Sequence, residues 1–191
     1  MTVVVTRRAF LFSSVLAGCA SATGRREVPA DRAPLRLAVG TILPGEGPPP
    51  LPAANFIDER RSRDLVRALR ERLAQRLLAA GGAATLEIAF EQAALTERLI
   101  EGRVGGVGGL VAREPTHAFE GALAVGLRVV DAAGREAARV RVAVQRSRSL
   151  PAGSSVAARE DAARALAGDL LEQFDRALES AVREQLAPWL V

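Results

Sequence analysis

Few side chains in this sequence have the types and spacing that catalysis would need. The chain has one histidine, His117, and one cysteine, Cys19, so a metal site with two histidine ligands cannot form, and we expect no metal ion or other cofactor. A serine hydrolase would have to use His117 as its base, but no nucleophile-elbow motif accompanies it. We therefore expect a protein that is not an enzyme, with a hydrolase that uses His117 as an alternative.

Three further features are explained more simply by structure than by chemistry. Glu97 and Glu101 could act as general acid and base, but carboxylates close to a loop are usually solvated. Residues 102–110, GRVGGVGGL, are rich in glycine but lack the lysine and the hydroxyl of a phosphate-binding loop. Ser154 and Ser155 precede a helical pattern, which they are expected to cap.

The position of Cys19 points to covalent chemistry of another kind. Arg7 and Arg8 precede an apolar run from Ala9 to Gly18, which is too short for the roughly 20 residues of a membrane-spanning helix. This order is typical of a secretory signal peptide. Leu16, Ala17, Gly18 and Cys19 resemble the lipobox of bacterial lipoproteins. That resemblance implies that the peptide before Cys19 is removed, that its sulfur is joined to diacylglycerol and that the new amino terminus is acylated.

The flanking residues bear on export and sorting. Residues 6–11, TRRAFL, resemble the twin-arginine export motif, although Phe12 stands where lysine is frequent. Export through either the twin-arginine route or the general secretion channel therefore stays open. Ala20 follows the cysteine, whereas aspartate there favours retention in the inner membrane of Gram-negative bacteria. The resemblance thus implies a lipid anchor at the periplasmic face of the outer membrane.

Charge argues against nucleic acid as a partner. The whole chain has a net charge of +4, from 26 basic and 22 acidic residues. Six arginines and two acidic residues precede Leu37, so 20 of each sign remain from there to Val191. Aromatic residues make up only 4% of the chain, which leaves few platforms for stacking bases. We therefore expect a neutral domain that does not bind nucleic acid.

Hydropathy periods predict the elements that follow. Residues 35–42 predict one strand, which the prolines after it end. Helical spacing extends from Asn55 to Gly81, with Asn55 or Ser62 as the cap, and its apolar stripe consists of Ser62, Leu65, Val66, Leu69, Leu73, Leu77 and Ala80. We expect this stripe to face the core; an arginine-rich helix on a membrane surface is the alternative.

The second half of the chain predicts three strands and a helix. Residues 85–100 alternate, and residues 117–130 and 135–146 predict a hairpin around the turn Asp131–Gly134. A helix from Ser155 to Leu186 follows, with Val156, Ala163, Leu166, Leu170, Phe174, Ala177, Leu178 and Ala181 on its apolar stripe. Trp189 is expected to pack over the core, and contact with an interface is the alternative.

The order β-α-β-β-β-α predicts an α+β fold with a four-stranded mixed sheet and two amphipathic helices on one face. The other face would then be open. Its expected floor is Ala89, Ala93, Ala122, Ala124, Gly126 and Ala143, and its expected rim is Glu87, Glu91, Glu120, Arg128, Arg139 and Arg141. Small side chains between charged edges suit close contact with a partner, but an ordinary solvated face has the same composition.

The sequence therefore divides into a cleaved signal peptide (1–18), a lipidated tether (19–34) and a single α+β periplasmic domain (35–191). With its lipobox, the chain resembles small Gram-negative envelope lipoproteins. In element order it is similar to the auxiliary lipoproteins of lipid-transport ABC systems and to the lipopolysaccharide-assembly lipoprotein. The resemblance implies a non-enzymatic protein, held to the membrane by its N-terminal lipid, that binds an envelope protein or a lipid-transport complex. A structural assembly factor of the envelope is the alternative.

Overall fold

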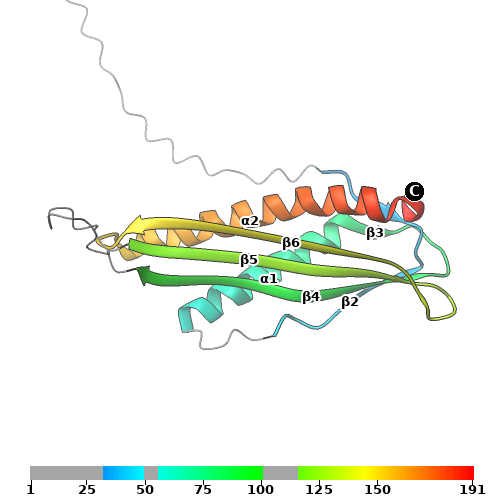
Figure 1. The fold of residues 1–191 in the computed structure, drawn as a ribbon, viewed down its shortest axis with the longest axis horizontal. Helices are drawn as coiled ribbons and strands as arrows, with labels where there is room; N and C mark the ends of the chain where they lie inside the picture. Colours follow the sequence, from blue (N-terminus) through cyan, green and yellow to red (C-terminus); the bar gives the residue numbers. More distant parts are fainter. Residues whose placement is uncertain (1–31, 50–55, 101–115) are drawn as a thin grey trace, which may run out of the picture.

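The computed structural model describes residues 32–49, 56–100 and 116–191 (Figure 1). Along the chain the elements are β1 (Leu35–Leu37), β2 (Thr41–Pro44), α1 (Phe56–Arg76), β3 (Leu77–Ala79), β4 (Thr85–Ile100), β5 (Thr116–Val130), β6 (Glu136–Pro151), α2 (Val156–Gln185) and a short 3₁₀-helix (Ala187–Trp189). Signal peptide, Cys19 and the beginning of the tether lie outside the described residues.

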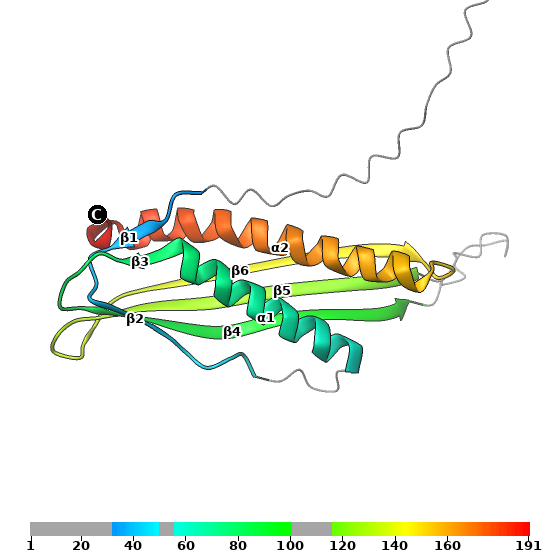
Figure 2. The same cartoon turned by 180° about the vertical axis from the view of Figure 1, so that it is seen from behind.

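The main sheet has four strands in the order β2-β4-β5-β6. Strand β2 is parallel to β4, because helix α1 connects them, and the other two pairs are antiparallel. Figures 1 and 2 show both helices on one face of this sheet. The predicted α+β class, the mixed four-stranded sheet and the one-sided placement of the helices are confirmed.

The prediction of one strand over residues 35–42 is wrong. The segment divides into β1 and β2, and β1 pairs in parallel with β3 in a separate two-stranded sheet. Helix α1 correspondingly ends at Arg76, not at Gly81, and Leu77 begins β3. Hydrophobic periodicity does not show where the helix ends, because Leu77 is buried in β3, at 3% exposure, just as it would be on the apolar stripe of a longer helix.

The core lies between the helices and the sheet. Leu65, Leu69 and Leu73 of α1 are at most 2% exposed, and the stripe of α2 buries Leu166, Leu170, Phe174 and Leu178 just as fully. Each such side chain contributes about 1.5–3 kcal/mol through burial. Val156 departs from the prediction: it is 66% exposed, because the part of α2 that packs on the core begins only at Ala162.

The long strands carry one irregularity that changes the prediction for the open face. A bulge between Phe90 and Gln92 adds one residue to β4 relative to β5. An extra residue reverses which face the following side chains occupy. Ala93 therefore pairs with the core residue Leu123 and is buried on the helix side, so its predicted place on the open face is wrong.

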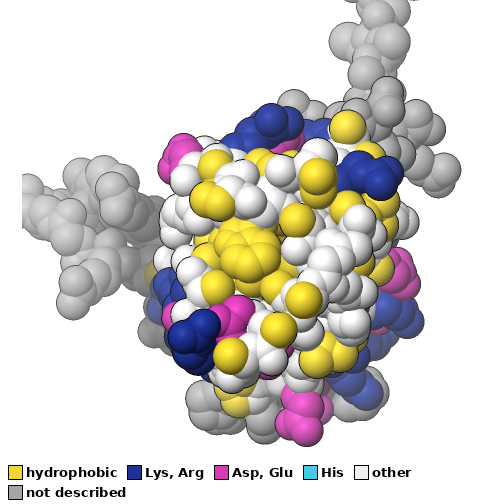
Figure 3. Space-filling model, turned by 90° about the vertical axis from the view of Figure 1, so that its right-hand side faces the viewer, with side chains coloured by type: hydrophobic (Ala, Val, Ile, Leu, Met, Phe, Trp, Pro, Cys, Tyr) yellow, Lys and Arg dark blue, Asp and Glu magenta, His cyan; other side chains and the backbone are white. Residues whose placement is uncertain are grey.

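One end of the molecule gathers several chain connections (Figure 1). The β3–β4 loop, the β5–β6 turn and the C-terminus all lie there, and Figure 3 shows hydrophobic side chains at the centre of this end. Trp189 packs against the core, as predicted. In the described residues no helix is long and apolar enough to cross a membrane.

Candidate functional site

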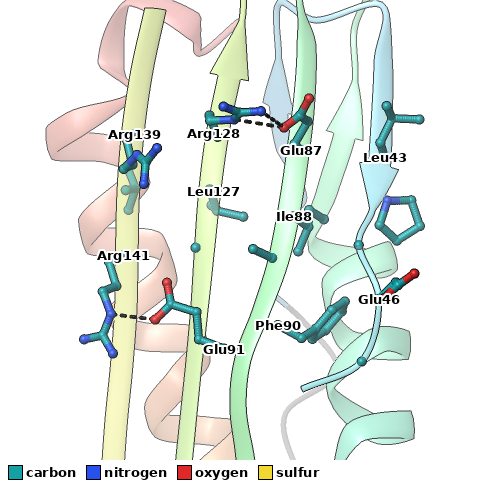
Figure 4. A pocket seen from close by; sticks show the side chains of 16 residues that line it. Leu43, Glu46, Glu87, Ile88, Phe90, Glu91, Leu127, Arg128, Arg139 and Arg141 are labelled. Carbon is teal, nitrogen blue, oxygen red and sulfur yellow. Dashed lines mark hydrogen bonds and ion pairs between the residues drawn. The ribbon is translucent and has the colours of Figure 1, made fainter. Parts of the chain in front are cut away.

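The face of the main sheet opposite the helices carries the candidate site (Figures 1 and 2). Alternation along β4, β5 and β6 sends apolar side chains to the helices and small or charged side chains to this face. Up to the bulge the alternation is regular: Leu86, Ile88 and Phe90 are buried, while Ala89 is exposed. The predicted rim residues Glu87, Glu91, Arg128, Arg139 and Arg141 do come together here (Figure 4).

These residues surround a shallow depression of about 660 Å³. Ala89 and Gly126 form its floor, and the end of β2 with the residues after it forms one wall. The full lining is Leu43, Pro44, Gly45, Glu46, Gly47, Glu87, Ile88, Ala89, Phe90, Glu91, Gly126, Leu127, Arg128, Arg139, Val140 and Arg141. The sequence does not predict the wall from Leu43 to Gly47, because the prolines there indicate only the end of a strand.

Two glycines shape this depression. A Cβ on Gly45 would stand 2.4 Å from the carbonyl oxygen of Ile88, so glycine allows the wall to lie directly against β4. The Gly45 amide donates a hydrogen bond to that carbonyl at 2.7 Å. On the floor, a Cβ on Gly126 would come within 3.1 Å of the Glu91 carboxylate. Glycine at both positions keeps the depression open and its carboxylate in place.

Ion pairs fix the charged side chains across the strands. Arg128 of β5 donates two hydrogen bonds to Glu87 of β4, at 2.9 and 2.6 Å. Arg141 of β6 donates through Nε to Glu91 at 2.7 Å, and no other described residue accepts from its terminal nitrogens. Guanidinium groups offer planar pairs of donors that match carboxylates and phosphates. The arrangement can bind a polar or anionic surface without chemical change to it.

A second depression of about 770 Å³ continues along the same face beyond the bulge. It is lined by polar and small residues, namely Gln92, Ala94, Thr96, Glu120, Gly121, Ala122, Gln145, Arg146 and Ser147. Of the predicted residues, Glu120 and Ala122 belong to this part. The exposed face of the sheet therefore carries two depressions, one after the other along the strands, and this arrangement suits an extended partner.

The remaining candidates from the sequence have separate outcomes. Cys19, Arg7 and Arg8, with Glu101 and the glycine-rich stretch 102–110, lie outside the described residues. Ser155 caps α2, as predicted: its hydroxyl accepts a hydrogen bond from the Ala158 amide at 3.2 Å. In the described residues no group of three or more histidine, cysteine or acidic side chains is placed to hold a metal ion.

Glu97 and His117 meet on the helix side, near the ends of β4 and β5. His117 Nδ1 lies 3.0 Å from Glu97 Oε1, and its Nε2 lies 3.2 Å from the Ala152 carbonyl oxygen. Both nitrogens thus face acceptors, and the nitrogen that a triad would turn toward a serine is occupied by a backbone carbonyl. The geometry makes this histidine a connector between two strand ends.

Arg61 of α1 is the centre of the same network. Its terminal nitrogens donate to Glu97 and to Glu160 of α2, each at 2.8 Å, and its carbon Cζ stands 5.6 Å from the centre of the Phe119 ring. Arg159 adds a second bond to Glu97 at 3.1 Å. No pattern in the sequence singled out Arg61, although it lies one position before Ser62 and four before Leu65 on the buried side of the helix.

Burial and pairing act in opposite directions on these charges. Burial alone would raise the pKa of Glu97, but hydrogen bonds and charges from Arg61 and Arg159 outweigh it and hold this pKa below its usual value. Burial would lower the pKa of Arg61, yet Glu97 and Glu160 raise it overall. Both groups are charged at neutral pH, so the network joins the two helices to the sheet electrostatically.

A groove runs between the two helices beside this network. It has a volume of about 340 Å³ and an apolar interior of Leu65, Ala68, Leu95, Ala163, Ala167 and Leu171. Arg60, Arg61, Asp64, Glu160 and Arg164 complete its lining. An apolar channel with charged groups around it has the character of a site for an amphipathic ligand.

Several of the solved structures that this chain resembles are described as bacterial lipoproteins. No family model matches the chain, and no curated protein does.

Three of these structures illustrate the similarity. A minor lipoprotein from Acinetobacter baumannii is 14% identical, with a TM-score of 0.36, over 78% of this chain and 92% of that one. Lipoprotein B from Nitrosomonas europaea is 19% identical, with a TM-score of 0.39, over 80% and 93%. Rare lipoprotein B from Shewanella oneidensis is 16% identical, with a TM-score of 0.36, over 74% and 92%. Similarities of this size do not define a family for the chain.

Proposed function

We propose that this chain is an envelope lipoprotein, anchored through Cys19 at the periplasmic face of the outer membrane, which binds a component of the lipid-transport machinery and catalyses no reaction. The observation that carries the proposal is the long, uncovered face of the main sheet. Its ion pairs and glycines hold a depression of about 660 Å³ in a fixed shape. A fixed polar surface favours recognition, because little order has to be created on binding.

The groove between the helices supports a role with lipids. Its apolar interior is near 340 Å³, and Arg61 at its side is already neutralised by Glu97 and Glu160. Native mass spectrometry of the full chain tests this part. A bound lipid supports lipid handling, whereas an empty protein favours the structural assembly factor.

Site-specific crosslinking tests the binding face. A photoreactive amino acid at Ala89, on the exposed floor of the depression, should crosslink a lipid-transport component in intact cells. The same group at Ala158, exposed on the first turn of α2, is the matched control. Reversal of charge in Arg141→Glu should abolish the Ala89 product, because Glu91 would then face a second carboxylate. Equal products from Ala89 and Ala158 would contradict the proposal.

The anchor has an independent test. Wild-type protein should incorporate labelled palmitate and sediment with outer membranes, and Cys19→Ser should do neither. A Cys19→Ser variant that still carries label would remove the proposed anchor without affecting the sheet face.

The hydrolase alternative is tested through His117→Ala. We expect this variant to support growth as the wild type does when its abundance is matched. A specific loss of function at equal abundance would favour catalysis instead.

A further inference from the structure

The end of the molecule shown in Figure 3 is unusual because four of its surface segments carry no charged side chains, although Asp131 and Arg135 flank one of them. We call this end the tip and define it as residues 38–42, 78–84, 132–134 and 187–191. Charged residues make up 25% of the chain, yet these four segments contain only alanine, glycine, valine, leucine, isoleucine, threonine, proline and tryptophan. Figure 3 shows the charged side chains around the edge of the patch. The tip is therefore a surface without charged side chains inside a charged border.

Hydrogen bonds within the tip hold its loops in place. The amides of Ala80 and Gly81 donate to the carbonyls of Leu37 and Val39, at 2.8 and 3.1 Å. In the opposite direction, Gly40 donates to Ala84 at 2.8 Å. Loops are rarely buried in an apolar phase, because their backbone N–H and C=O groups would lose the water molecules that hydrogen-bond to them. Here those amides already have partners, so contact with an apolar phase costs less.

Trp189 is the only tryptophan and belongs to this tip. The carbonyl of Trp189 accepts a hydrogen bond from the Ala38 amide at 2.7 Å, and Leu190 forms a bridge with Leu37. The side chain is thus partly buried on a fixed backbone, with the rest of it at the surface. Tryptophan is enriched at membrane interfaces, where its ring contacts acyl chains and its N–H reaches polar groups.

The chain before the domain enters near the same end. Arg32 lies 3.8 Å from Glu179, close to the end of α2, and β1 begins three residues later. Cys19 lies 13 residues before Arg32, and 13 residues span at most about 45 Å. A lipid on Cys19 would therefore keep the tip within reach of the bilayer that holds the lipid.

From these observations we infer that the tip is a membrane-contact site that inserts its uncharged side chains into the interfacial region of a lipid bilayer. The inference rests on the proposed function for the anchor that brings the tip to the membrane. Because the tip segments contain no basic residue, the contact depends on apolar burial and not on anionic lipid. Salt should consequently leave it unchanged.

The single tryptophan makes the test direct. Mature lipidated protein is reconstituted into vesicles of phosphatidylethanolamine and phosphatidylcholine, some with brominated acyl chains, and Trp189 emission is recorded. We expect a blue shift relative to detergent-free protein without vesicles, and quenching by the bromine, both at low and at high salt. Protein that floats with the vesicles but shows unquenched emission would overturn the inference while leaving the anchor intact.

Paired substitutions provide the control. Leu78→Glu with Ala133→Glu adds two charges at exposed positions of the tip and should remove most of the quenching. Val156→Glu with Ala157→Glu adds the same charges at exposed positions on the first turn of α2 and should leave it unchanged. Ala83→Glu serves as a second tip variant if the double variant fails to fold.

Two further outcomes separate the sources of a signal. Cys19→Ser should lose flotation, since a small apolar tip binds only marginally without acyl chains. If this variant floats like the wild type, the proposed anchor fails and the tip alone holds the protein. A blue shift that grows with protein concentration in the absence of lipid would overturn the inference in favour of self-association through the tip.

Discussion

Glu97 receives charged or polar groups from three elements: Arg61 of α1, Arg159 of α2 and His117 of β5. Its pKa is lower in the fold than the ordinary value of 4.5, so the unfolded chain binds more protons in the acid range. The stabilisation that ionised Glu97 provides is therefore fully present above about pH 4.5, and it is lost as the pH falls through the pKa of Glu97 in the folded protein. Asp58 and Glu160 also face this group of charges, at 3.7 and 2.8 Å from the terminal nitrogens of Arg61.

Glu97→Gln should accordingly lower the free energy of unfolding at pH 7 by about 3 kcal/mol, because Arg61 would remain buried with a lost partner. The variant should also lose less stability than the wild type between about pH 5 and about pH 3, the range around an ordinary carboxyl pKa. Urea denaturation across this pH range measures both effects.

Asp64→Asn is the control, because it removes an exposed ion pair with Arg67 and should change the free energy of unfolding by less than about 1 kcal/mol. Parallel pH profiles for wild type and Glu97→Gln would contradict the assignment.

At the scale of elements, helix α2 lies close against β5 at Gly121. A Cβ there would stand 2.2 Å from Leu170 Cδ1, and Leu170 is completely buried. Gly121→Ala should therefore destabilise the protein by about 1–3 kcal/mol through overpacking. Gly168→Ala, on the same helix with nothing within 4 Å, should instead stabilise it by up to about 1 kcal/mol. Thermal unfolding compares the two variants, and equal shifts would show that the helix can move away from the strand.

The elements also show what the sequence could predict. Alternation and helical spacing depend on neighbouring residues, so the long strands, both helices and the hairpin were predictable. The pairing of Leu77 with Leu35 depends on residues 42 positions apart, and no local pattern reports it. The bulge after Phe90 likewise arises from pairing, which is why Ala93 was assigned to the wrong face. At the candidate site, residue types and strand alternation predicted the charged rim. The wall at Gly45 and the role of Arg61 depend on tertiary contacts, which local sequence patterns do not report.

The proposed contacts define an orientation for the whole molecule. Strands β4, β5 and β6 run along its length, and a strand of 15 residues extends about 50 Å. With the tip at the bilayer, the network around Arg61 and the first turn of α2 would stand about 50 Å away, toward the periplasm. The open face of the sheet would then stand upright on the membrane, accessible to a partner that spans the same distance.

Depth measurements test this orientation. A nitroxide attached at Ala133, on the tip, should respond to a lipid-dissolved relaxing agent in reconstituted vesicles, whereas one at Ala158, on the first turn of α2, should respond only to an aqueous one. The two alanines are both exposed, so the labels differ in position and not in burial. A response to the lipid-dissolved agent at both sites would mean that the molecule lies flat on the membrane, and a response only to the aqueous agent at both would mean that the tip does not insert. In that case one long side, and not the tip, would face the lipid, and part of the open sheet face would no longer be free for a partner.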